Sequence, residues 1–250
     1  MAMWIAIAVF ALGQQDSSSI GYAARFRLWD ATGKSVAIVA YQETSPGAKP
    51  DNAGLPVGFS VHQSDIDNRL ATDTTWTEPP GATSGYLLLA TRDSLRTWTV
   101  LAVTADGHLL VRAHGTQRAW DGVETVMSDL LVASSARAMP WPVGSDTLLV
   151  PRSDSVKQSD SVHVGYQIHG ANRRGTARTT LTVTDISNAK RGKVVLRLAW
   201  NSSLNGPVTT VDRIIDVTAL RPGRYELTLQ SQDISGAGTT VRTADVTVIK

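Results

Sequence analysis

The sequence predicts an all-β protein that consists of two consecutive antiparallel β-sandwich modules, preceded by a short apolar N-terminal segment. Thr, Ser, Val and Gly are abundant while charged residues make up only 18% of the chain, a balance that favours strands because β-branched side chains fit a pleated surface. Short alternating segments bounded by turn residues recur along the chain, and no amphipathic helical pattern is evident. A length of 250 residues accommodates two domains of ordinary size.

The N-terminal segment, residues 1–13, is an uncharged apolar run, and the first charged residue is Asp16. The run is shorter than the roughly 20 residues that span a bilayer as a helix. Three interpretations stay open: a secretory signal peptide cleaved before Gln14, although no basic residue precedes the run; an uncleaved hydrophobic anchor; or an apolar element packed on the body of the protein. As an anchor, its membrane or partner contacts would be Trp4, Ile5, Ile7, Val9 and Phe10.

The first module is predicted to cover residues 20–133. Its opening strand places Arg25 and Arg27 on a polar face opposite alternating apolar residues. Residues 63–80 are polar and are expected to be irregular. The Asp106-Gly107 pair predicts a hairpin, because such turns favour Asp-Gly. The expected strands are 20–28, 36–41, 57–62, 86–91, 98–104, 108–113 and 123–133.

The second module is predicted to cover residues 145–250, after a Pro-rich hinge at 134–144. Pro140 and Pro142 favour this boundary, since proline cannot donate a backbone hydrogen bond to a neighbouring strand. Short strands separated by turn signals, as in a β-sandwich, then follow. They are expected at 147–150, 161–169, 179–186, 193–200, 209–217, 224–231 and 240–249.

The most distinct local pattern in the second module combines Leu220, Pro222, Gly223 and Tyr225. A Pro-Gly turn leads into a strand in which apolar and polar residues alternate from Tyr225 onward. A Tyr at such a strand entrance resembles the tyrosine corner of immunoglobulin-like sandwiches. The modules are therefore expected to be immunoglobulin-like, with the Tyr225 ring in the core and its hydroxyl bonded to the backbone near Leu220.

Residues 20–250 also resemble the C-terminal β-rich region of bacterial secreted or periplasmic proteins of the GWxTD type. The features that carry the resemblance, in order along the chain, are 22–28, the Ser-Asp-Leu strand at 126–133, the Pro-containing loop at 139–142, the strand at 162–168, the Leu-x-Pro-Gly-x-Tyr strand and the terminal segment 233–248. The resemblance implies an exported protein with two sandwiches. The Gly-Trp-x-Thr-Asp motif and its helical domain are absent from this sequence, so no function of that domain is carried over.

The sequence predicts no catalytic residue, metal ligand or cofactor site. The absence of Cys excludes disulfides, thiol catalysis and Cys-based zinc sites. A net charge of only +2 does not indicate a nucleic-acid partner. His163 and His169 would lie about 20 Å apart along one strand, which is too far to share a metal. Residues 65–68 begin like a calcium loop but lack its Gly and its closing Glu.

Residues 170–200 hold a local excess of positive charge. One interpretation is solvated loops and edge-strand charges that discourage aggregation; the other is contact with an acidic partner or with lipid headgroups. Arg173, Arg174, Lys190 and Arg191 are the candidates for such a contact. This stretch contains one acidic residue, Asp185, and seven basic residues: Arg173, Arg174, Arg178, Lys190, Arg191, Lys193 and Arg197.

Together these features favour a non-enzymatic, membrane-extrinsic or periplasmic scaffold subunit that stabilises a larger membrane-associated complex, for example a photosynthetic or respiratory one. Its partners would be other protein subunits, with membrane contact through the N-terminus and no nucleic acid. The alternative is an extracytoplasmic carbohydrate- or calcium-dependent binding module or an enzyme accessory domain. Rigid sandwiches with long loops serve either role.

Overall fold

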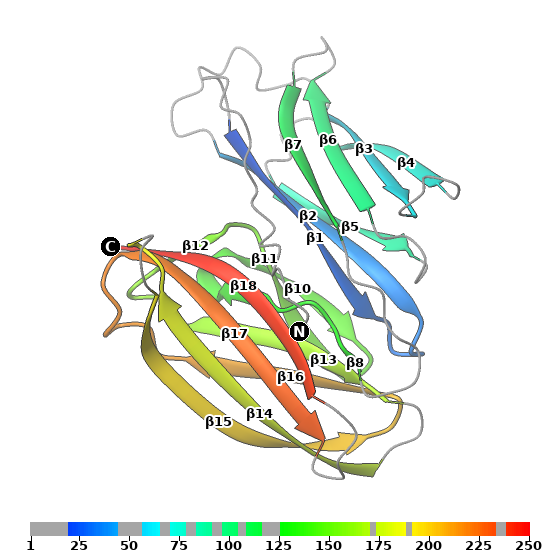
Figure 1. Cartoon of the computed structure of the whole chain (residues 1–250). Helices are drawn as coiled ribbons and strands as arrows, with labels where there is room; N and C mark the ends of the chain where they lie inside the picture. Colours follow the sequence, from blue (N-terminus) through cyan, green and yellow to red (C-terminus); the bar gives the residue numbers. More distant parts are fainter. Residues whose placement is uncertain are drawn as a thin grey trace, which may run out of the picture. The chain divides into compact units, whose positions relative to one another are not determined.

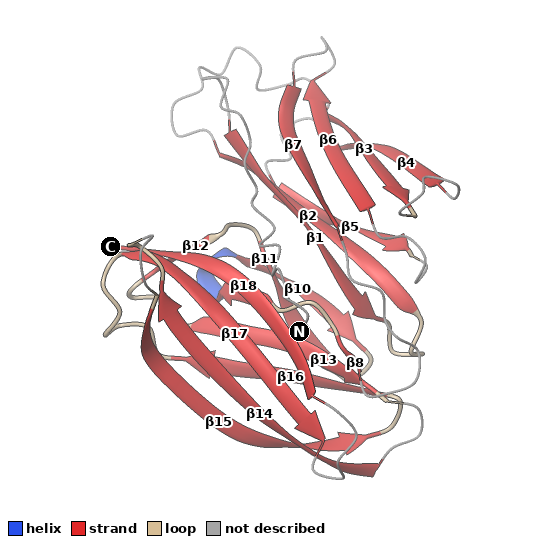
Figure 2. Cartoon of the chain, viewed as in Figure 1, coloured by secondary structure: helices blue, strands red, loops and turns tan. Residues whose placement is uncertain are grey.

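The computed structural model describes residues 20–44, 57–65, 71–78, 84–91, 97–104, 109–116, 126–170, 174–188, 192–233 and 239–250. These residues are almost all β-strand, apart from turns and a short 3-10 helix, η2, at Ser135–Arg137 (Figure 2). The prediction of an all-β protein is confirmed. The apolar segment 1–13 lies outside the described residues.

The chain forms two compact units, but their boundaries differ from the predicted ones. The first unit comprises Met1–Ala24, Gln42–Thr83 and Arg92–Ala119; the second comprises Arg25–Tyr41, Ser84–Thr91 and Trp120–Lys250. Residues 134–144 lie inside the second unit. The predicted division into consecutive modules at a Pro-rich hinge is therefore wrong.

The first unit contains a four-stranded antiparallel sheet with the order β4-β3-β6-β7. Its strands are β3 (Val57–Ser64), β4 (Ala71–Glu78), β6 (Thr97–Thr104) and β7 (Leu109–Thr116). The β6–β7 pair confirms the predicted hairpin. β4 corrects the expectation of an irregular segment: its Thr-rich sequence is polar but β-branched, and β-branched residues favour strands.

A glycine fixes the packing between β6 and β7. Trp98 and Gly115 face each other across the strands, and Trp98 is buried. A Cβ atom at position 115 would lie 2.8 Å from Cζ2 of the Trp98 ring. The indole therefore covers the glycine, and any larger residue would displace the ring.

The second unit is built around a sandwich of two sheets (Figure 1). The larger sheet has the order β12-β18-β17-β14-β15, and the smaller one β16-β13-β8, with β9 also paired to β13. Buried residues from both sheets, among them Tyr166, Leu181, Leu227 and Leu229, form one core. The strands are β8 (Val126–Met127), β9 (Leu131–Ser134), β12 (Ser155–Lys157), β13 (Val162–His169), β14 (Arg174–Asp185), β15 (Lys193–Asn205), β16 (Val208–Ile215), β17 (Gly223–Asp233) and β18 (Thr239–Ile249).

The Ser-Asp-Leu segment and the predicted hinge both belong to this second unit. β8 and β9 pair with β13, although residues 123–133 were expected to close the first module. Most of the predicted hinge forms β10 (Ala138–Val143), which makes a hairpin with β11 (Asp146–Pro151). Among the described strands β10 pairs only with β11, and proline is tolerated in a strand that has one open edge.

A three-stranded sheet with the order β1-β2-β5 completes the described strands: β1 (Ile20–Trp29), β2 (Ser35–Thr44) and β5 (Ser84–Ala90). Arg25 and Arg27, expected on a polar face, are only 7% and 1% exposed. Arg25 Nη2 donates to Thr91 Oγ1 at 3.0 Å, and Arg27 Nε donates to Ser35 Oγ at 3.2 Å. Burial lowers the pKa of Arg25 to about 10, although the charge of Asp129 opposes that shift. The polar-face prediction for these arginines is wrong, because their guanidinium groups are buried and hydrogen-bonded within the protein.

Gln167 connects β13 to β1 within the second unit. Its side chain accepts a hydrogen bond from the Trp29 N–H at 2.7 Å and donates to the Trp29 carbonyl at 2.8 Å. The Gln167 N–H donates to Ser128 Oγ at 2.8 Å, and the Ser128 N–H donates to the Gln167 carbonyl at 2.9 Å. One fully buried amide thus replaces the missing backbone pairing between two strands that are distant in the sequence.

Candidate functional site

The predicted tyrosine corner is present and gives the larger sheet of the second unit a fixed end. Tyr225 is buried in the core, and its hydroxyl donates to the Arg221 carbonyl at 2.7 Å. Leu220 is buried beside this turn, and its N–H donates to the Val217 carbonyl at 3.0 Å. Pro222 is exposed, and Gly223 packs so closely on the Ser187 hydroxyl that a Cβ atom would clash. The buried Tyr225 ring and the bond from its hydroxyl to the backbone are the two features that the sequence predicted for the corner.

The opposite edge of this sheet is formed by β15. Among the described strands, β15 pairs only with β14. The two strands pair in continuous register, from Arg174 opposite Asn205 to Val183 opposite Leu196. The register then shifts, so that Thr184 lies opposite Val194. This shift is a β-bulge that adds one residue, Val195, to the edge strand.

The core is incompletely covered along β15. On β14, the core-facing Ala177, Leu181 and Val183 are fully buried. On β15, the core-facing Leu196, Leu198 and Trp200 pack against the same core but remain partly exposed. Trp200 is held in place because its indole Nε1 donates to the Tyr166 hydroxyl at 3.0 Å. The sandwich therefore presents an ordered apolar flank at this edge.

Exposed valines extend the apolar flank toward the beginning of β15. Val194 and Val195, at the bulge, are 50% and 39% exposed. Ile214, near the end of β16, is 66% exposed. The opposite side of the sandwich is better closed, since Arg242 of β18 donates from Nη2 to the Met127 carbonyl of β8 at 2.6 Å.

The structure places part of the predicted basic cluster on the edge strand and on its neighbour. Lys193 and Arg197 lie on β15 and Arg178 lies on β14, and all three are exposed. Arg178 and Arg197 alternate with core-facing residues, so they lie on the outer face of the sheet. Arg173, Lys190 and Arg191 lie outside the described residues, and only the backbone of Arg174 is described. The sequence indicated no binding role for Leu196, Leu198 or Trp200, because their alternation does not distinguish an edge strand from a central one.

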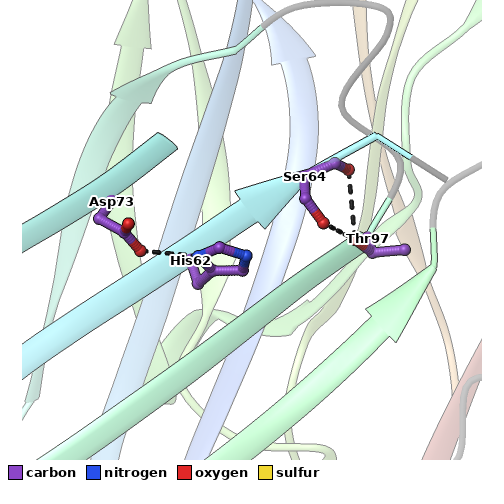
Figure 3. A network of polar contacts seen from close by, with 4 residues as sticks. All are labelled: His62, Ser64, Asp73 and Thr97. Carbon is purple, nitrogen blue, oxygen red and sulfur yellow. Dashed lines mark hydrogen bonds and ion pairs between the residues drawn. The ribbon is translucent and has the colours of Figure 1, made fainter. Parts of the chain in front are cut away.

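A second group of polar side chains lies on β3, β4 and β6 of the first unit (Figure 3). His62 Nδ1 lies 2.7 Å from Asp73 Oδ1, directly across the two strands. The hydroxyls of Ser64 and Thr97 are in contact, and Thr97 Oγ1 also donates to the Ser64 carbonyl at 3.2 Å. Both partners of the His62–Asp73 pair are solvent-accessible, so the pair contributes at most about 1 kcal/mol to stability.

Two further histidines, His163 and His169, make contacts within the second unit. His163 Nδ1 lies 2.7 Å from Asp212 Oδ2, while the His169 ring stacks on Trp29 with centroids 4.9 Å apart. Within the part of the chain that the structure describes, no three His, Cys, Asp or Glu side chains are placed to hold a metal. Asp65 is described, but the rest of the proposed calcium loop is not. Nor does any helix among the described residues have the length and apolar character needed to cross a membrane.

Comparison with known proteins identifies no family, since no family model and no curated protein matches the chain. Among solved structures, trypsin-activated α-2-macroglobulin from Escherichia coli aligns over 94% of this chain and 17% of its own, with 9% identity and a TM-score of 0.31. The native conformation of the same macroglobulin aligns over 93% of this chain and 16% of its own, with 10% identity and a TM-score of 0.30. Red sea bream transglutaminase aligns over 92% of this chain and 31% of its own, with 11% identity and a TM-score of 0.25. The chain thus spans less than a third of any of these proteins, and no function follows from the likeness.

Proposed function

We propose that the protein is a non-enzymatic, extracytoplasmic scaffold subunit that docks a partner protein along β15 and so stabilises a membrane-associated complex. The observation that carries the proposal is the half-covered core at the β15 edge, where Leu196, Leu198 and Trp200 remain partly exposed beside Val194 and Val195. Ordered apolar surface of this kind is typical of the centre of a protein interface.

The rigidity of the second unit supports a docking role. Tyr225 fixes one end of the larger sheet, and the Tyr166–Trp200 hydrogen bond holds the edge residue Trp200 in one orientation. A preorganised surface loses little conformational freedom on binding, so more of the burial energy contributes to affinity. At about 25 cal/mol per Å² of apolar area, covering these side chains would contribute several kcal/mol before the costs of association.

The membrane part of the proposal is supported by the sequence. Residues 1–13 are uncharged and apolar, and the resemblance to exported GWxTD-type proteins implies an extracytoplasmic location. A single short apolar segment holds a protein at a membrane only reversibly, so stable residence requires a second contact. A protein partner on β15 would supply that contact.

The docking role is tested by placing charges on the edge. The double variant Val194→Asp/Val195→Asp in the full chain should fold normally, because both side chains are exposed, but should lose the partner during purification from native membranes. Val241→Asp is the matched control: Val241 is 46% exposed and lies on β18 of the same sheet. Circular dichroism verifies folding, and mass spectrometry identifies the partner and its stoichiometry.

A partner that stays with the double variant at the same stoichiometry would overturn docking at β15. Binding of a glycan or calcium with no protein partner would favour the alternative role. The anchor is tested separately by deleting residues 1–13, which should release the protein into the soluble fraction. A mature chain that starts at Gln14 and still sediments with membranes would exclude the anchor but not the scaffold role.

A further inference from the structure

We propose that the partner contributes an extended segment that adds as a further strand to β15, and that apolar residues alternate with Asp or Glu in that segment. This inference rests on the proposed docking role and specifies the chemistry of the occupant. Three features of β15 support it: one backbone edge without a paired strand among the described residues, an apolar side and a basic side, and a local excess of positive charge.

The backbone of β15 offers an edge to a further strand. From Leu196 to Asn205 it pairs with β14 in continuous register, and it pairs with no other described strand. In such a strand alternate N–H and C=O groups point away from the sheet, which makes the edge a template for another extended chain.

The beginning of β15 is protected against such pairing. Lys193 is exposed, and the bulge at Val195 interrupts the regular spacing of backbone groups. Edge lysines and bulges are devices that prevent strands from pairing indiscriminately. At the other end, the Asn205 N–H already donates to Thr209 Oγ1 at 3.2 Å. Strand addition is therefore confined to Leu196–Leu204, and the exposed valines would contact the partner through side chains only.

The two sides of β15 define the pattern of the incoming strand. Leu196, Leu198 and Trp200 face the core and remain partly exposed, so residues of the added strand on that side would be apolar and would complete the core. Arg197 points to the outer face, and Arg178 of β14, which lies opposite Asn201 four residues further along β15, points to the same face. Residues on that side would be acidic, because opposite charges on adjacent strands are favourable.

The same charges disfavour a second copy of this chain as the occupant. Antiparallel pairing of two β15 strands would place Arg197 of both copies on the same outer face of the joined sheet, with Lys193 of each copy just beyond the paired stretch. The stretch 170–200 contains seven bases and one acid, so the two edges would repel each other. Charge complementarity thus selects an acidic segment from a different protein.

The test measures binding of synthetic peptides to the full-length chain by fluorescence polarisation. The probe is a fluorescein-labelled peptide of alternating Val and Glu, about as long as the regular part of β15. A second peptide of the same sequence is N-methylated at every second residue, which removes the donors of one backbone edge and leaves the charge unchanged. A third peptide carries Lys in place of Glu.

The Val–Glu peptide should bind, and the N-methylated and Lys peptides should not. Arg197→Glu should weaken binding of the Val–Glu peptide about tenfold and allow the Lys peptide to bind. Arg224→Glu is the matched control, because Arg224 is exposed on the outer face of the same sheet but lies on the central strand β17; its effect should stay below about twofold.

Equal binding of the N-methylated peptide would overturn strand addition, and equal binding of the Lys peptide would overturn the acidic pattern. Failure of all peptides would overturn the inference, as would a concentration-dependent dimer that Arg197→Glu abolishes. The proposed function is judged separately: it stands if Val194→Asp/Val195→Asp still loses the native partner, and it fails with the inference if that partner is retained.

Discussion

Replacing Gln167 by Met is expected to destabilise the second unit by about 2–6 kcal/mol. Gln167 is fully buried, and its amide accepts from the Trp29 N–H at 2.7 Å and donates to the Trp29 carbonyl at 2.8 Å. Met is similar in size but can replace neither hydrogen bond. Two buried backbone groups of Trp29 would lose these partners, and each such loss costs about 1–3 kcal/mol, which gives the expected range.

The effect is measured by urea unfolding followed through tryptophan fluorescence and circular dichroism. Gln158→Met is the control, because Gln158 makes one side-chain hydrogen bond, to the Leu220 carbonyl, at a half-buried site. That variant should lose about 0.5–1.5 kcal/mol. If Gln167→Met costs no more than Gln158→Met, at an unchanged slope against urea, the account of Gln167 as the connection between β1 and β13 is refuted.

Three further predictions concern single side chains. Tyr225→Phe should cost about 1–3 kcal/mol by removing the bond to the Arg221 carbonyl, and Tyr225→Ala about 3–5 kcal/mol; equal values for both in thermal unfolding would contradict the corner. Gly115→Val should cost about 1–3 kcal/mol by displacing Trp98, and an unchanged Trp98 fluorescence and melting temperature would argue against that packing. For Asp160, burial opposes ionisation, but hydrogen bonds from Ser134 and Lys157 outweigh it, so the pKa lies below the usual 3.8. The stability that Asp160 contributes is therefore complete above about pH 4 and lost as the pH falls through the lowered pKa, and Asp160→Asn should flatten this acid loss in urea titrations at pH 2–5.

The features that the sequence predicted well are local ones. The Pro222-Gly223 turn and the alternation after Tyr225 lie within one short segment, and the structure contains both the strand and the tyrosine corner. The hairpin at Asp106-Gly107 was predicted for the same reason, and β6 and β7 pair as expected. Turn chemistry and period-2 alternation determine such elements without reference to the rest of the chain.

The division into modules failed because it depends on long-range pairing. β9 pairs with β13, and nothing in residues 131–134 alone shows which strand they join. Pro140 and Pro142 suggested a linker, but both lie in β10, where proline is compatible with pairing along one edge only.

Burial was misjudged where segments distant in the sequence pack together. Arg25 and Arg27 follow an alternation typical of a solvent-facing side, yet both are buried among polar partners. Likewise, the half-exposure of Leu196 and Trp200 could not be predicted, since a core-facing residue has the same sequence pattern in a central strand and in an edge strand.

The most direct test of the central claim is amide hydrogen exchange of the full-length chain, alone and in complex with its purified partner. Docking by strand addition predicts slower exchange within Leu196–Leu204, at about every second amide, because alternate N–H groups of an edge strand point outward. Exchange in β17, a central strand of the same sheet, should change little. Unchanged exchange throughout β15, with protection confined to the first unit, would contradict the account.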